Sequence, residues 1–280
     1  MEVSVIAAVL AGAAMHAGWN SLVKIGLDRF SMILLLSLAQ GLQSLVLLWF
    51  FPMPAMAAWP WLAASAFLHT GYKLFLIRAY AHGDLSQIYP LARGSAPLMV
   101  AIFSAPVLGE KLSLTGTLAV VAIGLGVALM SLKGGGALGR LPAKALFYAA
   151  GTAVCTAAYT IVDGIGARAS GTASGFTFWM FVLDTFLMVT FALATRGGGA
   201  IRRLAPEWRT GLAAGGLSLG GYWIAIWAFT VAPIALVAAL RETSVLFVML
   251  IAVVLLGERA GAWRWLAAAL IVGGIGLVRL

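Results

Sequence analysis

Apolar residues occur in long runs along this chain, separated by short polar or Pro- and Gly-rich connections. A helix needs about 20 predominantly apolar residues to cross roughly 30 Å of hydrocarbon. Backbone groups in lipid must be hydrogen-bonded within the protein, and the sequence lacks the alternating pattern of membrane β-strands. The pattern therefore predicts an all-α integral membrane protein. Ten transmembrane helices are expected, near residues 3–25, 30–51, 60–81, 86–108, 114–132, 143–166, 174–195, 208–230, 232–256 and 262–279.

Composition supports a protein that is solvated by a bilayer. Of the 280 residues, 62% are hydrophobic and 10% are charged, with a mean hydropathy of +1.03, whereas soluble proteins carry about 25% charged residues. The net charge of +9 does not indicate nucleic-acid binding, because the lysines and arginines are scattered through short loops, where a basic excess is ordinary. The single cysteine, Cys155, excludes an intramolecular disulfide, and we expect neither a metal site nor a cofactor.

The chain contains an internal duplication. Arg93 precedes the Gly-Glu pair of the turn 108–111 by sixteen residues, and Arg241 precedes the Gly-Glu pair of the turn 256–259 by the same number. A glycine-rich span follows each turn. We therefore predict two related units, residues 1–138 and 139–280, joined through the Gly-rich segment 133–140.

Each predicted unit holds five spans, which is an odd number. The second unit must then enter the membrane in the opposite sense to the first. Inverted repeats of this kind are an architecture of transporters, in which the substrate site lies near the bilayer midplane where the repeats meet. We expect a central cavity there.

Ionisable side chains deep in a bilayer are costly, so each one is a candidate for function. Arg93 and Arg241 occupy matching positions of the two units and are predicted to face the shared cavity. Guanidinium groups bind carboxylates well, and the deep cations, which include Lys73, outnumber the deep anions Asp184 and Glu242. This balance favours a substrate with a carboxylate. The alternative is that both arginines make structural ion pairs with those two acids.

Two predicted spans carry polar residues along one helical face. The first span has His16, Trp19, Asn20 and Lys24, and the third has His69, Tyr72, Lys73 and Tyr80. Such faces are not expected to point toward lipid. Each histidine is as well explained by a hydrogen bond between helices as by proton transfer.

Aromatic side chains with a polar tip recur on the spans that we expect to line the cavity. They include Trp19, Tyr72, Tyr80, Tyr89, Tyr159, Tyr222, Trp223 and Trp227. A wall of this composition suits amphipathic or aromatic solutes. Packing between helices and interfacial belts explain such residues equally well.

Several of these motifs together resemble a known family. They are the segment 83–94 with Tyr-Pro-Leu-Ala-Arg-Gly at its end, the paired turns 108–111 and 256–259, and His16–Asn20 with Lys24. The sequence resembles the drug/metabolite transporter superfamily in its ten-helix EamA branch, over nearly the whole chain. The resemblance implies a carrier of the bacterial inner membrane that works by alternating access and exports amino acids, aromatic ones included, or other metabolites.

The sequence thus predicts a secondary transporter whose partners are a small-molecule substrate and the lipid bilayer. We treat it as a monomer that binds no nucleic acid. Proton-coupled efflux of cationic drugs is the alternative, with Asp184 or Glu242 as the exchanging acid. An intramembrane enzyme would require paired carboxylates or a metal constellation, and the carboxylates Asp163, Asp184 and Glu242 fall on separate spans without ligand spacing. We therefore expect no enzymatic activity.

Overall fold

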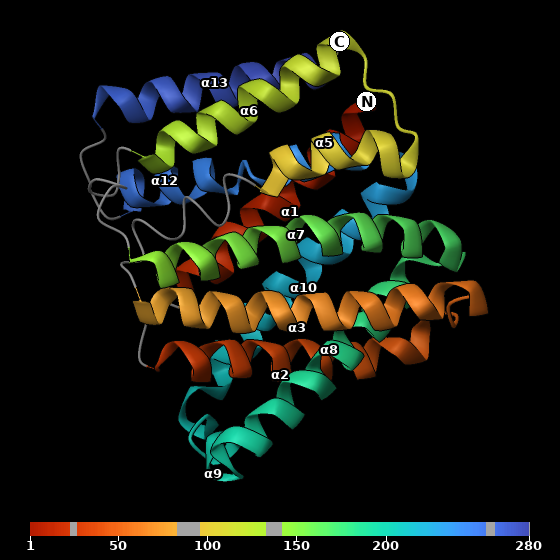
Figure 1. Cartoon of the computed structure of the whole chain (residues 1–280), viewed down its shortest axis with the longest axis vertical. Coiled ribbons are helices and arrows are strands. Elements are labelled where there is room, and N and C mark those ends of the chain that lie inside the picture. Colours follow the sequence, from red (N-terminus) through yellow and green to blue (C-terminus); the bar gives the residue numbers. More distant parts are fainter. Residues whose placement is uncertain (23–26, 83–95, 133–141, 256–260, 280) are drawn as a thin grey trace.

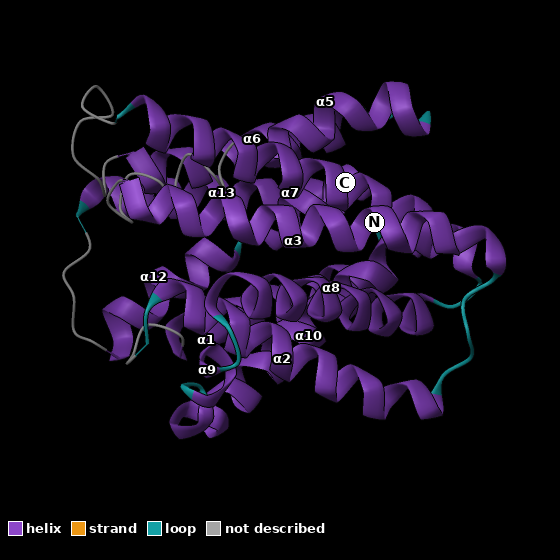
Figure 2. Ribbon diagram, turned by 60° about the horizontal axis from the view of Figure 1, so that its bottom comes forward, coloured by secondary structure: helices purple, strands orange, loops and turns teal. Residues whose placement is uncertain are grey.

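The computed structural model describes residues 1–22, 27–82, 96–132, 142–255 and 261–279. Helices and connecting loops make up this part of the chain, and Figure 2 shows no strand in it. The expected all-α class is confirmed.

The helices follow the expected spans closely. In the first half they are α1 (Val3–Leu22), α2 (Arg29–Leu47), α3 (Trp59–His82), α5 (Ala96–Leu108) and α6 (Leu114–Leu132). In the second half they are α7 (Ala143–Ser170), α8 (Ala173–Arg196), α10 (Trp208–Val231), α11 (Ile234–Arg241), α12 (Ser244–Leu255) and α13 (Ala262–Arg279). Short helical turns are η1 (Leu48–Phe50), η2 (Met56–Ala58), α9 (Gly199–Arg202) and η4 (Ala205–Glu207).

Seven helices of the described chain are long and apolar enough to cross a membrane, and α6 contains a shorter apolar stretch. Helix α3 has 24 residues, but Lys73 and Arg78 interrupt its apolar sequence. Helix α5 begins at Ala96, and the first part of the expected span 86–108 lies outside the described residues. The structure confirms a multi-helix membrane fold, and the count of ten spans stays a prediction.

The contacts between helices repeat when the two halves of the chain are exchanged. Helix α1 packs extensively against α10, α3 against α7, α2 against α8, and α6 against α13. By their order along the chain, α1 corresponds to α7 and α3 to α10, so exchanging the halves converts the α1–α10 contact into the α7–α3 contact. The α2–α8 and α6–α13 contacts each join two corresponding helices and are unchanged by the exchange. In Figure 1, α6 begins at the right of the bundle, where α5 ends, and α13 begins at the left. The two corresponding helices thus run in opposite directions in this view, and the inversion of the whole repeat stays a prediction.

The contact between α6 and α13 repeats residue by residue. A Cβ atom at Gly126 would lie 2.6 Å from Ile271 Cγ1, and one at Gly274 would lie 2.6 Å from Ile123 Cγ1. Both residues of one contact are offset by 148 positions from those of the other (126 to 274, 123 to 271), as are the two Gly-Glu turns (109 to 257). Small residues allow two helix backbones to approach closely in a membrane.

The expected ninth span is a helix with a break. Helix α11 ends at Arg241, Glu242 and Thr243 form a turn, and α12 begins at Ser244. Through the break, N–H groups donate to the carbonyl three residues earlier, as from Thr243 to Leu240 at 3.1 Å. Such a tightened segment inside a helix is common at functional hinges. It places Arg241 at the C-terminus of α11, where a cation is favoured by the helix dipole.

A hydrogen-bonded ion pair ties the two halves together at one end of the bundle. Arg168, near the end of α7, donates to Glu110 Oε1 at 2.6 Å, and Glu110 Oε2 accepts from the N–H of Ile234 at 2.9 Å. Arg168 also donates to the carbonyl oxygens of Phe229 at 2.8 Å and Ala232 at 3.1 Å. The α5–α6 turn is thereby fixed to the junction of α10 and α11.

Asp28 caps the N-terminus of α2 outside the membrane spans. Its Oδ1 accepts from the N–H groups of Phe30 at 3.1 Å and Ser31 at 3.3 Å, and from Arg196 Nη1 at 3.3 Å. Burial raises the pKa of Asp28, but the hydrogen bonds from Ser31 and the attraction of Arg196 outweigh it and hold the pKa below its usual value.

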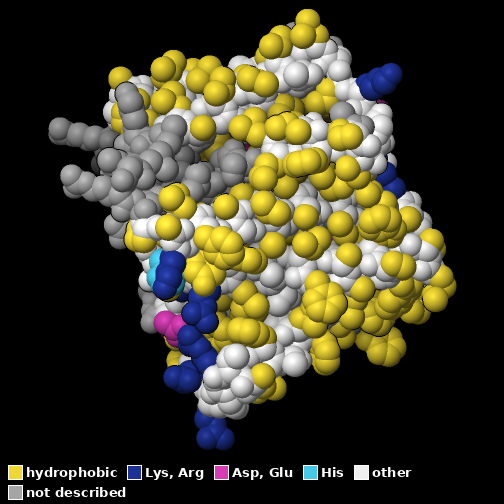
Figure 3. Space-filling model, viewed as in Figure 1, with side chains coloured by type: hydrophobic (Ala, Val, Ile, Leu, Met, Phe, Trp, Pro, Cys, Tyr) yellow, Lys and Arg dark blue, Asp and Glu magenta, His cyan; other side chains and the backbone are white. Residues whose placement is uncertain are grey.

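The outer surface is strongly apolar. Large side chains such as Trp49, Phe50 and Val254 are exposed by 88%, 74% and 73%. On the face shown in Figure 3, hydrophobic side chains cover the middle, and lysine and arginine side chains gather at the edges. A surface of this kind fits a lipid environment with basic groups at its margins.

Candidate functional site

A cavity of about 90 Å³ lies between α1, α2, α3, α7, α8, α10 and α11. Its walls come from both halves of the chain. A water molecule needs about 10–15 Å³ of such space, so the cavity holds several waters or the polar end of a small solute. Its polar and aromatic lining is His16, Trp19, Gln40, His69, Tyr72, Lys73, Tyr159, Ser218, Tyr222 and Arg241.

Many of the residues proposed from the sequence lie on this wall. They are His16, Trp19, His69, Tyr72, Lys73, Tyr222 and Arg241. The polar faces of the first and third spans therefore meet at one cavity. Their roles in substrate binding stay predictions.

Three other proposed residues lie off the cavity wall. Asn20 Nδ2 donates to a carbonyl one turn earlier in α1 at 2.9 Å. Trp223 Nε1 donates to Ser174 Oγ at 2.9 Å. The Tyr80 ring lies 5.5 Å from the guanidinium carbon of Arg29. These contacts make packing the simpler role for the three side chains.

Asp184 and Glu242, two further proposed residues, are not among the residues that line the cavity. Asp184 is fully buried and Glu242 is 7% exposed. Tyr89 and Arg93 lie outside the described residues. Of the two arginines predicted to face the cavity, the described chain therefore includes Arg241.

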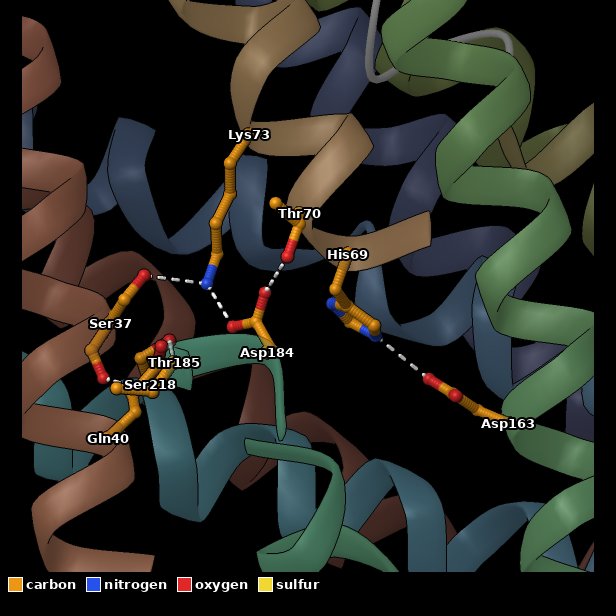
Figure 4. Close-up of polar contacts among 9 residues, drawn as sticks. All are labelled: Ser37, Gln40, His69, Thr70, Lys73, Asp163, Asp184, Thr185 and Ser218. Carbon is orange, nitrogen blue, oxygen red and sulfur yellow. Dashed lines mark hydrogen bonds and ion pairs between the residues drawn. The ribbon is translucent and has the colours of Figure 1, made fainter. Parts of the chain in front are cut away.

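Lys73 is held in a buried polar network between α2, α3 and α8 (Figure 4). Its Nζ forms an ion pair with Asp184 Oδ2 and donates to Ser37 Oγ at 2.8 Å. Thr70 Oγ1 donates to Asp184 Oδ1 at 3.0 Å. Because both oxygens of Asp184 are hydrogen-bonded and its charge is matched by Lys73, this network satisfies the rule that buried charges are paired.

A second buried network connects α3, α7 and α10. His69 Nε2 lies 3.0 Å from Asp163 Oδ2, and the Tyr222 hydroxyl donates to the same oxygen. The His69 ring stacks on Tyr159, with centroids 4.0 Å apart. Asp163 is fully buried, and its Oδ1 has no hydrogen-bond partner in the described part of the chain. A buried carboxylate oxygen without a partner is unusual and marks a site for a proton or a polar ligand.

The sequence pattern did not identify Asp163 as a site residue. The expected span 143–166 placed it near a membrane edge, where a carboxylate is ordinary. Helix α7 runs through to Ser170 and has 28 residues, which puts Asp163 well inside the helix. Its hydrophobic neighbours Ile161, Val162 and Ile165 were the available signal.

Arg241 provides a positive charge to the cavity and has no ion-pair partner among the described acids. Its guanidinium carbon lies 4.6 Å from the centre of the Tyr222 ring, and no carboxylate of the described chain forms an ion pair with it. The structural alternative paired the arginines with Asp184 and Glu242. Asp184 is bonded to Lys73, and among the described residues no ion pair joins Arg241 to Glu242. The cavity therefore offers one guanidinium to an anionic ligand.

Comparison with protein families matches the chain to the EamA-like transporter family over residues 3–132 and 143–280. The chain belongs to this family. The two matched segments coincide with the two halves whose packing is related by exchange, so each half is one repeat of this EamA-like transporter. The protein is therefore a multi-pass membrane protein of a transporter family.

Solved structures support the fold of this EamA-like transporter. Twenty-nine chains match it. One of them, described only as "Crystal structure of protein", superposes with a TM-score of 0.76 at 18% sequence identity, covering 98% of this chain and 94% of its own. That likeness shows a shared fold. No curated protein matches the sequence.

Proposed function

We propose that this transporter carries small amphipathic carboxylates, amino acids first among them, by alternating access, and that Arg241 binds the carboxylate. The support is the placement of Arg241 on the cavity wall, where none of the described carboxylates forms an ion pair with it. A charged group in a poorly solvated cavity gains strongly from an opposite charge and from charge-assisted hydrogen bonds.

The rest of the cavity wall supports an amphipathic solute. Tyr72, Tyr159 and Trp19 supply aromatic surface, while Gln40 and Ser218 supply polar groups and bond to one another at 2.9 Å. A pocket with mainly aromatic walls and few polar groups orients a ligand that has one charged end. An amino acid with a large side chain, whose carboxylate and ammonium groups lie together at one end, fits this description.

Cationic substrates find less support in the cavity. Among the described residues that line it, none is an aspartate or a glutamate. Of the two acids that the sequence suggested for cation exchange, Asp184 is paired with Lys73, and Glu242 is not among the residues that line the cavity. We therefore propose carboxylate substrates rather than cationic ones. We further propose the bacterial inner membrane as its location and amino-acid export as its direction, as the family resemblance implies.

Equilibrium exchange of radiolabelled solutes in proteoliposomes tests this proposal. With a panel of amino acids at equal pH on both sides, Arg241→Ala is expected to reduce exchange at least about tenfold, because a charged hydrogen bond contributes about 1.5–3 kcal/mol. Arg209→Ala is the matched control, since Arg209 lies over Trp208 at 5.3 Å on the exposed surface. Wild-type exchange rates in a well-folded Arg241→Ala protein would disprove the anion site.

A further inference from the structure

The second buried network, formed by His69, Asp163 and Tyr222, can bind a proton, and carboxylate binding at Arg241 does not by itself require this. Asp163 has a carboxylate oxygen, Oδ1, that no hydrogen bond satisfies within the described residues, while its Oδ2 contacts both His69 and Tyr222. His69 and Tyr222 line the cavity, so Asp163 lies directly behind the wall. The network can hold an added proton on the His69 ring or on the free carboxylate oxygen.

We propose that the His69–Asp163 pair takes up a proton when a substrate carboxylate binds Arg241, so that proton and carboxylate cross the membrane together. This inference rests on the proposed function, because it requires an anion at Arg241.

Tyr222 provides the physical link between the two sites. One face of its ring lies 4.6 Å from the Arg241 guanidinium carbon, and its hydroxyl donates to Asp163. In the empty transporter the positive charge of Arg241 opposes an added proton nearby. A bound carboxylate cancels that charge, and a charge in a low-dielectric cavity acts strongly over such distances. Binding of the anion therefore favours binding of the proton.

The other titratable groups at the cavity are less suited to this task. Tyr159 stacks on His69, and Tyr72 contacts Tyr159 edge to face. Lys73 is paired with Asp184, whose two oxygens are both hydrogen-bonded.

His16, from α1, accepts a hydrogen bond from Trp19 at 3.2 Å on its Nδ1. In the described chain, His69 forms an ion pair or hydrogen bond with Asp163 Oδ2, and the second carboxylate oxygen, Oδ1, has no hydrogen-bond partner there.

The linkage is reciprocal, so a proton on the pair must strengthen carboxylate binding by the same factor. Net flux then follows the sum of the proton and substrate gradients. An inward proton gradient favours uptake, so the export proposed above requires an outward substrate gradient that exceeds it.

The direct test uses the wild-type protein purified in detergent, in weakly buffered solution with a pH-sensitive dye. Addition of an amino acid that the transporter exchanges is expected to cause proton uptake by the protein. Substrate affinity is expected to rise about 5- to 150-fold from mildly alkaline to mildly acidic buffer, the usual range of such coupling. Proton release, or no proton movement, with exchange intact would overturn the linkage and leave the carboxylate site standing.

Variants assign the effect to its residues. Asp163→Asn is expected to retain exchange at equal pH and to lose both substrate-evoked proton uptake and accumulation driven by a pH gradient. Asp28→Asn, the same chemical change at an exposed carboxylate, is the control. Loss of proton uptake in Asp184→Asn with its retention in Asp163→Asn would assign the proton to the other network and refute the proposal. If the wild type exchanges no carboxylate at all, the proposed function and this inference both fail.

Discussion

The guanidinium of Arg241 lies over the face of the Tyr222 ring, with 4.6 Å between the guanidinium carbon and the ring centre. The same tyrosine donates its hydroxyl hydrogen to Asp163 from the opposite edge. A cation on an aromatic face is attracted by about 0.5–2 kcal/mol, more when water is excluded. Tyr222 therefore orients the guanidinium toward the cavity and joins it to a buried acid.

Two substitutions of Tyr222 distinguish the effect of its ring on substrate affinity from the effect of its hydroxyl. Tyr222→Phe keeps the aromatic face under Arg241, so substrate affinity in equilibrium exchange is expected to change less than about threefold. Tyr222→Leu removes the face and is expected to weaken affinity by about 2- to 30-fold, which corresponds to the cation–π energy. Half-saturation concentrations of exchange measure both. Equal losses in the two variants would show that the ring does not position Arg241.

The ion pair of Lys73 with Asp184 predicts strong non-additivity in stability. Lys73→Met alone leaves a buried carboxylate without its cation and is expected to destabilise the fold by about 3–5 kcal/mol. The double variant Lys73→Met with Asp184→Leu removes both charges and is expected to recover most of that loss. Thermal unfolding in detergent measures the cycle. A double variant as unstable as the sum of the singles would show that the two residues act independently.

The close contact of α6 with α13 predicts opposite effects for two glycine substitutions. Gly126→Ala places a Cβ 2.6 Å from Ile271 Cγ1 and is expected to destabilise the protein by about 1–3 kcal/mol, the usual cost of overpacking. Gly273→Ala has no atom within 4 Å of its added carbon, and alanine favours the helix by up to about 1 kcal/mol. It serves as the matched control. Similar unfolding temperatures for the two variants would contradict the contact.

The bonds between Arg168 and Glu110 predict a gate at one end of the cavity. Arg168→Ala is expected to favour opening at that end by about 1–2 kcal/mol, or about 5- to 30-fold in population. Ser218→Cys in a Cys155→Ala background places a probe on the cavity wall, and an impermeant thiol reagent applied from each side measures access. Arg196→Ala, at the far end of α8, removes an ion pair with Asp28 and is the control. Unchanged access in Arg168→Ala would exclude this gate.

The lowered pKa of Asp28 predicts a small pH dependence of stability. Because the pKa is lower in the folded state, the stabilisation is present above the unfolded value of about 4 and is lost as pH falls through the folded pKa. The pair with Arg196 is largely exposed, so the effect is below about 1 kcal/mol. Asp28→Asn is expected to remove this contribution and flatten the acid side of the stability curve. An unchanged acid side would contradict the assignment.

Much of the fold was predictable because the bilayer imposes its pattern on the sequence. Apolar runs marked the helices, and the repeated Gly-Glu turns at matching spacing indicated the duplication that the family match confirms over both halves. The polar faces beginning at His16 and His69 pointed to the cavity because costly polar groups are kept from lipid.

The pairing of side chains was not predictable, because it depends on tertiary contacts between distant positions. Lys73 and Asp184 are 111 residues apart, and nothing local in either span indicates the other. The break after Arg241 falls at a polar interruption of the ninth span, residues 241–244, but that pattern does not reveal the change in hydrogen-bond partners. Asp163 was not identified because α7 continues to Ser170, beyond the expected span 143–166, so that Asp163 lies farther from the end of the helix than the sequence indicated.

Accessibility of Ser218→Cys tests the central claim, a cavity that opens to either side and binds a carboxylate at Arg241. In proteoliposomes, an impermeant thiol reagent is expected to label this position from both sides of the membrane. A saturating amino acid should slow both reactions, and Arg241→Ala should abolish that protection. Labelling from one side alone, or labelling that no amino acid slows, would contradict the claim.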